Sequence, residues 1–135
     1  MSSLKQIKQA EKALSRQQQV VREFNLLVGD IQRCEKTIRE LQAELESINA
    51  RYPGQRTTRE DVAYLSDLLK CAQRKLAWEK SITSLQKRTP SLLQELGTLM
   101  NDPENPPGDQ AKAEMLGALQ SLQGAMERLQ NVKPA

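Results

Sequence analysis

Two clusters of basic residues in this 135-residue chain have types that suit binding chemistry. The first cluster surrounds a proline-glycine segment near position 53. Three guanidinium groups and one phenol lie within nine positions there. Arg and Tyr are enriched at protein contacts, and they also suit phosphate contacts and base stacking. The alternative is a turn that is merely polar. The candidate contact residues of this first cluster are Arg51, Tyr52, Arg56 and Arg59.

The second cluster covers residues 70–88, where six positive charges stand against the single carboxylate of Glu79. In a helix, positions 70, 74 and 88 lie near one face, whereas the other cations spread around it. This impure stripe suits either a surface that binds an acidic partner or an ordinary solvated face. The candidate contact residues are Lys70, Arg74, Lys87 and Arg88, with Lys75 and Lys80 completing the run.

Catalytic chemistry has little to build on. The chain contains no histidine, the commonest general acid or base and the commonest metal ligand. Glu40 and Glu44 are four positions apart, a spacing that could bind a metal or serve acid–base chemistry. Because no partner motif accompanies them, we expect them to be exposed residues beside a helical seam. We therefore expect no catalytic residue, no metal, no cofactor and no small-molecule substrate, and we expect that the protein is not an enzyme.

The two cysteines, Cys34 and Cys71, are widely spaced and form no metal-binding pattern. We expect reduced, half-buried thiols, with Cys34 on an apolar seam. No window approaches 18 uninterrupted apolar residues, so no membrane insertion is expected. Together these features predict a soluble, cytoplasmic protein, and its net charge of +3 names no partner.

The elements that must position these residues are helices. Ala, Leu, Glu, Lys and Arg make up 63 of the 135 residues, close to the share found in coiled coils, and only 3% of the residues are aromatic. Sheet proteins pack on β-branched and aromatic residues, so this composition excludes all-β folds. We expect an all-α fold in one helical domain spanning residues 1–135.

A heptad repeat dominates the first third of the chain and predicts a helix over about 3–51. Gln17 falls on its seam, so the repeat should drift in phase there, with Leu4, Ile7 and Leu14 continuing an apolar stripe upstream. The seam consists of Val20, Phe24, Leu27, Ile31, Cys34, Ile38, Leu41, Leu45, Ile48 and Tyr52.

The proline-glycine turn should lead into a second helix over about 58–100, because residues 57–60 have the spacing of a capping box. The expected buried stripe slips in phase near residues 76–78, which resembles a stutter. Pro90 either kinks this helix or breaks it. The stripe consists of Val62, Leu65, Leu69, Ala72 and Leu76, then Trp78, Ile82, Leu85, Leu92, Leu96 and Leu99.

Three prolines and a glycine make residues 101–108 a loop, and a third helix should follow over about 109–131. Its expected stripe is Met115, Leu119, Leu122, Met126 and Leu129.

The short turn predicts a long antiparallel helical hairpin in which facing residue numbers sum to about 110. Leu41 should then face the region of Leu69, and Cys34 should lie about one turn away from Cys71. The shorter third helix should pack beside the open end, giving an elongated three-helix bundle whose two-helix part projects toward the turn. Whether it packs within the chain or swaps between chains stays open.

A two-helix segment covers each seam only once, so apolar residues beside the seams should be available to another chain. We expect a non-enzymatic coiled-coil interaction protein, a scaffold, adaptor or chaperone-like subunit that acts through its helical faces and its hairpin tip. The partner would be another protein, a second copy of the chain included. The alternative is a helical hairpin that binds nucleic acid through the two basic clusters. The residues beside the seams are Leu26, Val28, Leu68 and Leu93.

Overall fold

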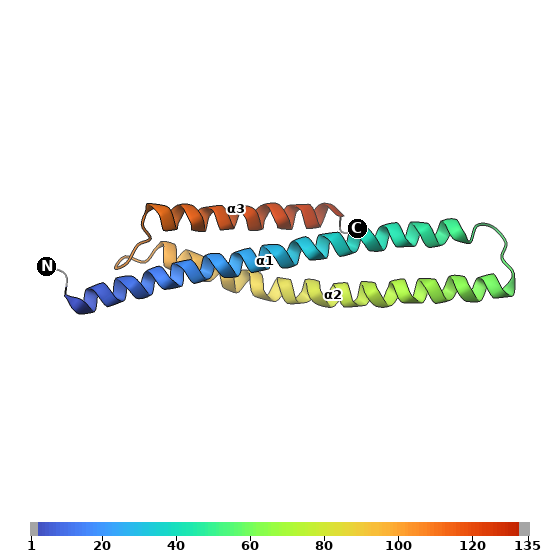
Figure 1. The fold of residues 1–135 in the computed structure, drawn as a ribbon, viewed down its shortest axis with the longest axis horizontal. Helices are drawn as coiled ribbons and strands as arrows, with labels where there is room; N and C mark the ends of the chain where they lie inside the picture. Colours follow the sequence, from blue (N-terminus) through green and yellow to red (C-terminus); the bar gives the residue numbers. More distant parts are fainter. Residues whose placement is uncertain (1–2, 133–135) are drawn as a thin grey trace.

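The computed structural model describes residues 3–132, which form three helices and no strand. Helix α1 spans Leu4–Arg51, α2 spans Thr58–Met100 and α3 spans Asp109–Val132, each within one residue of the expected bounds. Figure 1 shows α1 running along the molecule with α2 on one side and α3 on the other. The predicted fold class is confirmed: a long antiparallel helical hairpin carries a shorter third helix packed within the same chain.

Both long helices begin at capping boxes. The Thr57 side chain accepts a hydrogen bond from the Glu60 amide, and the Glu60 side chain accepts one from the Thr57 amide. Ser3 and Gln6 form the same reciprocal pair at the start of α1. Between the helices, Gly54 has φ +68°, a backbone conformation that other residues adopt only with strain. The chain therefore reverses direction within a few residues.

Two contacts fix the register of the hairpin. Trp78 Nε1 donates a hydrogen bond to the Cys34 carbonyl at 2.8 Å, and Cys71 Sγ lies 3.9 Å from the Leu41 carbonyl. The numbers 34 and 78, and likewise 41 and 71, sum to 112, close to the expected 110. Each cysteine thus faces a different part of the other helix, and both are free thiols.

The heptad seam of α1 forms the core and continues further upstream than expected, but Leu45, which the sequence placed on the seam, is 43% exposed in the two-helix part. Gln17 is buried on that seam, and its Nε2 lies 3.5 Å from the carbonyl of Asn105 in the loop before α3. The predicted phase drift at Gln17 is wrong, because the loop supplies a polar partner that lets the amide stay in the seam. The upstream stripe that the drift implied is exposed instead, and it includes Leu4, Ile7 and Leu14.

Along α2 the expected buried stripe is correct only from Trp78 onward. In the first half of α2, the residues of the expected stripe point outward, and Leu68 and Cys71 are the ones half-buried against α1. Positions 64, 68, 71, 78, 82 and 85 keep one heptad phase, with exposed Lys75 at the remaining position, so the predicted stutter is wrong. Two lines of apolar residues run along this part of α2. The line that has the same heptad phase as Trp78 packs against α1, and the other line faces outward.

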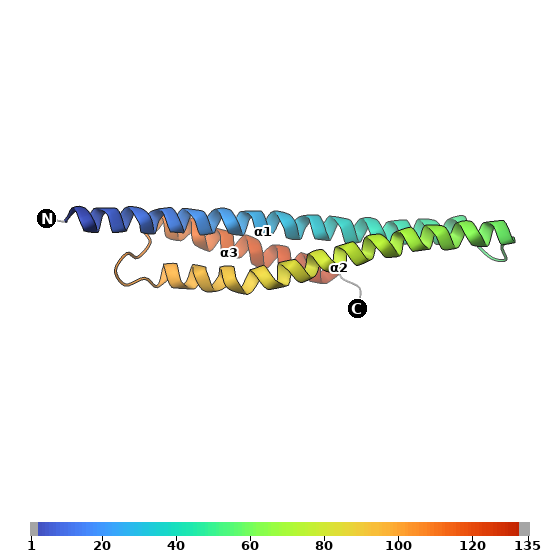
Figure 2. The same ribbon diagram turned by 90° about the horizontal axis from the view of Figure 1, so that it is seen from below.

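Helix α2 is continuous through Pro90, so a break there is excluded. Pro90 has no amide hydrogen, and the preceding Thr89 turns its hydroxyl inward to donate to the Leu85 carbonyl at 2.7 Å. Figure 2 shows α2 as one unbroken helix from the hairpin tip to the loop before α3. Thr89 is one of the two buried polar residues in the described chain, and its hydroxyl is satisfied.

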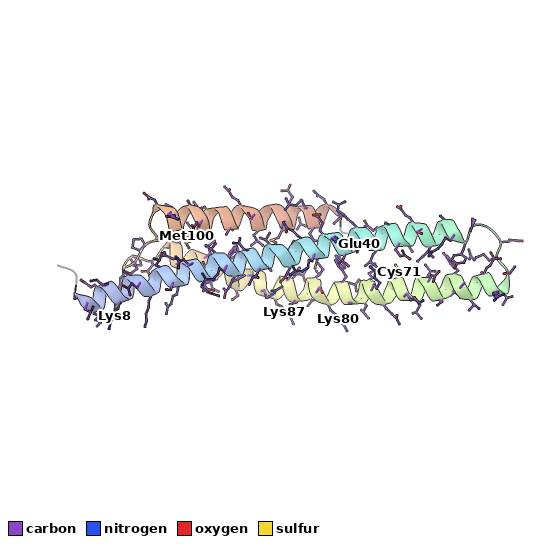
Figure 3. The ribbon with its side chains drawn as sticks, viewed as in Figure 1. Lys8, Glu40, Cys71, Lys80, Lys87 and Met100 are labelled. Atoms are coloured by element: carbon purple, nitrogen blue, oxygen red, sulfur yellow. The ribbon has the colours of Figure 1, made fainter. Side chains whose placement is uncertain are left out.

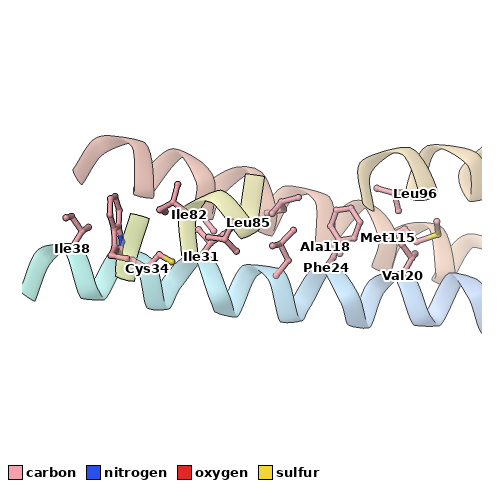
Figure 4. Packing of buried hydrophobic residues seen from close by; sticks show 14 of the residues in the cluster. Val20, Phe24, Ile31, Cys34, Ile38, Ile82, Leu85, Leu96, Met115 and Ala118 are labelled. Carbon is pink, nitrogen blue, oxygen red and sulfur yellow. The ribbon is translucent and has the colours of Figure 1, made fainter. Parts of the chain in front are cut away.

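Helix α3 packs on α1 through alternate small and large residues. Met115, Ala118, Leu122 and Ala125 are buried, whereas the expected Leu119, Met126 and Leu129 are only partly buried against the core. Small alanines let two helix backbones approach closely, which explains why they take the innermost positions. Figure 4 shows Met115 and Ala118 beside Val20 and Phe24 of α1. Helices α2 and α3 each pack closely against α1, and side chains from all three helices share one core.

Candidate functional site

The hairpin tip carries the first predicted cluster, and its side chains are bound to one another. Arg56 Nε lies 2.8 Å from Asp61 Oδ1, and Arg56 Nη1 donates to the Tyr52 carbonyl at 2.9 Å. The same guanidinium carbon lies 4.2 Å from the ring centroid of Tyr64, within cation–π range. One arginine thus joins the end of α1, the turn and the start of α2.

The remaining tip groups form a second set of contacts. Tyr52 Oη donates to Asp67 Oδ2 at 3.1 Å, and Arg51 Nη2 lies 3.5 Å from the same carboxylate and 3.6 Å from Glu44 Oε1. The hydrogen bond to the Asp67 carboxylate raises the pKa of Tyr52, because it favours the protonated phenol. The rings of Tyr52 and Tyr64 meet edge to face, with centroids 5.6 Å apart.

The sequence correctly placed Arg51, Tyr52, Arg56 and Arg59 at one end of the molecule. Three of them hold the two helices together there, and their polar groups have intramolecular partners. Arg59 is exposed and forms no ion pair within residues 3–132. A role of the tip in binding stays a prediction.

The second predicted cluster is divided by the fold. Arg74 and Arg88 line a groove of about 520 Å³ between α1 and α2, which we call the basic groove. Figure 3 shows Lys80 and Lys87 along the edge of α2 that points away from α1, and neither lines the groove. Lys70 does not line it either. The groove is lined by Asp30, Arg33, Cys34, Thr37, Arg74, Ala77, Trp78, Ser81, Ser84, Leu85 and Arg88.

Three guanidinium groups and one carboxylate set the charge of the basic groove. Asp30 pairs with both Arg33 and Arg88, and the Arg88 contact measures 2.8 Å. Arg74 forms no ion pair within the described part of the chain, residues 3–132. Sequence reasoning missed Arg33, because only the register of the hairpin brings α1 residue 33 beside α2 residue 88. The groove therefore keeps a net positive charge suited to an anion.

The floor of the basic groove is apolar and unreactive. Cys34 and Trp78 are both buried, and the indole is oriented by its hydrogen bond to the Cys34 carbonyl. Burial raises the pKa of the Cys34 thiol, while the charges of Arg33 and Arg88 partly oppose that rise. A thiol that stays protonated is a poor nucleophile. Cys34 therefore acts as a small seam residue, as its spacing indicated.

A row of exposed aliphatic side chains follows the outer face of α2. Val62, Leu65, Leu69 and Leu76 are 55% to 64% exposed, and Ala72 lies between them at the matching position. Their spacing of three and four residues is that of a coiled-coil seam. We call these five residues the outer leucine stripe. They are the residues that the sequence assigned to the hairpin core.

The outer leucine stripe lies mostly beyond the reach of α3. The last residue of α3, Val132, accepts a hydrogen bond from Gln42 Nε2, and α1 and α2 continue past this point as a two-helix hairpin (Figure 1). Leu41 faces Cys71 there, so only the inner line of α2 is covered. Of the residues expected to flank the seams, Leu26 and Leu93 are exposed, whereas Val28 and Leu68 are half-buried.

The carboxylates have structural partners. Glu40 Oε1 lies 3.9 Å from Lys36 Nζ, and Glu44 pairs with Arg51 as described above. Within residues 3–132, no three side chains of the His, Cys, Asp and Glu types come together as a metal site would require. None of the three described helices combines the length and apolar character needed to cross a membrane.

Comparison of the chain with protein-family models, with curated proteins and with solved structures gave no match.

Proposed function

We propose that this protein is a non-enzymatic interaction protein that docks a helix of another protein chain, a second copy included, on the outer leucine stripe. The observation that carries the proposal is the exposure of four large aliphatic residues at coiled-coil spacing on one face of α2. In this role the hairpin acts as a scaffold, adaptor or chaperone-like subunit. Two free thiols agree with a reducing compartment, and we propose a cytoplasmic location.

The energetics favour a helical partner for this surface. Single exposed leucines are common on protein surfaces, but a contiguous apolar row at a regular spacing marks an interaction site. A helix laid along the stripe buries one side chain per turn, and the hairpin then becomes a three-helix bundle in the part that α3 does not reach. The long α1–α2 pair is already folded, so docking requires little ordering of this chain.

The test compares protein capture by two matched variants. We expect the natural chain to retain one or a few proteins at stoichiometric levels from its native lysate, with or without nuclease. The double variant Leu65→Gln, Leu69→Gln should lose them, whereas Leu26→Gln, which changes a leucine 69% exposed on α1, should retain them. Equal capture by all three proteins would contradict docking on the stripe.

The basic groove supports a second candidate function, a helical hairpin that binds nucleic acid. The specific observation in its favour is the convergence of Arg33, Arg74 and Arg88 on one groove, with Lys70 nearby in sequence. Phosphate contacts release counterions, so binding of this kind weakens steeply with salt. The triple variant Arg33→Gln, Arg74→Gln, Arg88→Gln should then lose affinity for a nucleic-acid probe, and an unchanged affinity would exclude the groove.

A further inference from the structure

We propose that the occupant of the outer leucine stripe is a second copy of this chain, with the two α2 helices antiparallel. This inference rests on the function proposed above, since it names the partner of the same surface. Three features support this partner: the charges beside the stripe, the register that its apolar residues allow, and the area that the contact buries.

The charges along α2 change sign halfway along the stripe. From residue 60 to residue 67 there are three carboxylates and no cation, and from residue 70 to residue 80 there are four cations and one carboxylate. Asp67 contacts Arg51 of α1 and Arg74 lines the basic groove, so the charges left for a second copy are Glu60 and Asp61 at one end and Lys70, Lys75 and Lys80 at the other. Antiparallel pairing sets the acidic end of one copy against the basic end of the other, whereas parallel pairing aligns like charges. The helix dipoles also oppose each other in the antiparallel pair.

One antiparallel register satisfies both the apolar residues and the flanking charges. When Leu65 faces Leu69 of the second copy, Val62 faces its Ala72, and two-fold symmetry repeats both layers. The same register places Asp61 beside Lys75 of the second copy, since both occupy the same flanking heptad position. Both side chains are accessible: Lys75 is exposed, and Asp61 contacts Arg56 through Oδ1.

Leu68 is compatible with this register. It lies on the same side of α2 as Asp61 and Lys75, midway between them, and it is half-buried against α1. In the register above, the two-fold axis passes near this position, so Leu68 meets Leu68 of the second copy. A side chain that the hairpin leaves partly open is thereby covered.

The size of the contact sets the strength to expect. Each of the four large aliphatic residues of the stripe leaves on the order of 100 Å² for burial, so two copies bury roughly 800 Å², which is below standard specific interfaces and typical of weak, transient ones. The dimer should therefore be reversible and dependent on concentration. An obligate dimer would need an area that the stripe does not provide.

The experiment is sedimentation equilibrium from about 5 to about 500 μM, a range that suits a weak, reversible dimer. We expect a monomer–dimer equilibrium for the natural chain and for Leu26→Gln. The double variant Leu65→Gln, Leu69→Gln should be monomeric throughout. Far-UV circular dichroism shows that each variant is folded, which is expected because the substituted leucines are exposed.

The variant Lys75→Glu tests the orientation. It sets a second acid beside Asp61 of the other copy in the antiparallel dimer, so the dissociation constant should rise about threefold or more, the size typical of an exposed charge pair. Adding Asp61→Lys should restore it. In a parallel dimer Lys75 lies beside Lys80 of the other copy, so the same variant would tighten the dimer, and that result would overturn the proposal.

A natural chain that stays monomeric over the whole range would also overturn the second copy as occupant. That outcome leaves the proposed function separately testable. If Leu65→Gln, Leu69→Gln still abolishes lysate capture while the chain is monomeric, the stripe docks a different protein. If capture is unchanged as well, both the proposed function and the dimer fail.

Discussion

Leu41 and Leu69 provide the sharpest test of which line of α2 packs inside the hairpin. The sequence predicts that these two leucines face each other across the hairpin. In the structure Leu41 is 4% exposed and faces Cys71, whereas Leu69 lies on the outer leucine stripe. Replacing each leucine with alanine removes the same atoms from two very different surroundings.

The expected costs follow from burial. Leu→Ala at a buried position lowers the free energy of unfolding by about 3 kcal/mol, because transfer energy is lost and a cavity is left. Leu69→Ala removes a side chain that is mostly in water, and alanine favours helix slightly more than leucine does, so its cost should be below about 1 kcal/mol. In melting temperature, Leu41→Ala should lose about 10 °C and Leu69→Ala at most a few degrees.

The assay is urea unfolding followed by far-UV circular dichroism and by the fluorescence of Trp78, which is buried at the α1–α2 contact. Protein concentration is kept low so that association through the stripe adds nothing to stability. Similar losses in the free energy of unfolding for Leu41→Ala and Leu69→Ala would refute the packing of Cys71, rather than Leu69, against Leu41. They would restore the packing that the sequence predicted.

Two further predictions concern titration and reactivity. The raised pKa of Tyr52 means that the folded state keeps a phenol proton that the unfolded state loses first, so its contribution is full below about pH 10 and is lost as pH rises through the folded pKa. Urea midpoints measured at increasing alkaline pH should therefore fall more for the natural chain than for Tyr52→Phe, and parallel curves would contradict the hydrogen bond to Asp67. A thiol reagent at neutral pH should modify half-buried Cys71 first and Cys34 only as the protein unfolds, because burial raises the pKa of the Cys34 thiol and limits access. Mass spectrometry of the labelled peptides reads this order, and equal rates for the two cysteines would show that the seam opens readily.

Local patterns in the sequence predicted the helices and their pairing. The capping box at Thr57, the proline-glycine turn and the heptad of α1 each depend on residues close together in the chain, so their structures could be inferred directly. The short turn then limited the register to within a few residues of the observed one.

The inner face of α2 could not be inferred in the same way. Two apolar lines with the same spacing run along its first half, and composition favours the line with more leucines. The choice depends on tertiary contacts such as the hydrogen bond from Tyr64 to Asn49 at 2.8 Å and the fit of Trp78 against Cys34. Gln17 was misjudged for a related reason, since its partner Asn105 lies 88 positions away.

The candidate sites show the same limit. The tip arginines were correctly grouped, but the sequence could not show that the carboxylates of Asp61 and Asp67 already contact them. Arg33 was overlooked, because its neighbour Arg88 belongs to another helix.

The arrangement of α2 and α3 around α1 divides the molecule into layers of unequal local stability. Detachment of α3 uncovers core side chains of both α1 and α2, but it leaves the contacts of Trp78 and Cys71 with α1 in place, because those contacts join α1 and α2 alone. The amide hydrogens of α3 can then exchange with solvent through a partial opening that does not unfold the hairpin. The amide hydrogens of α1 between Val20 and Ile38 lie where α2 and α3 both cover the helix, so they exchange only when the whole fold is lost.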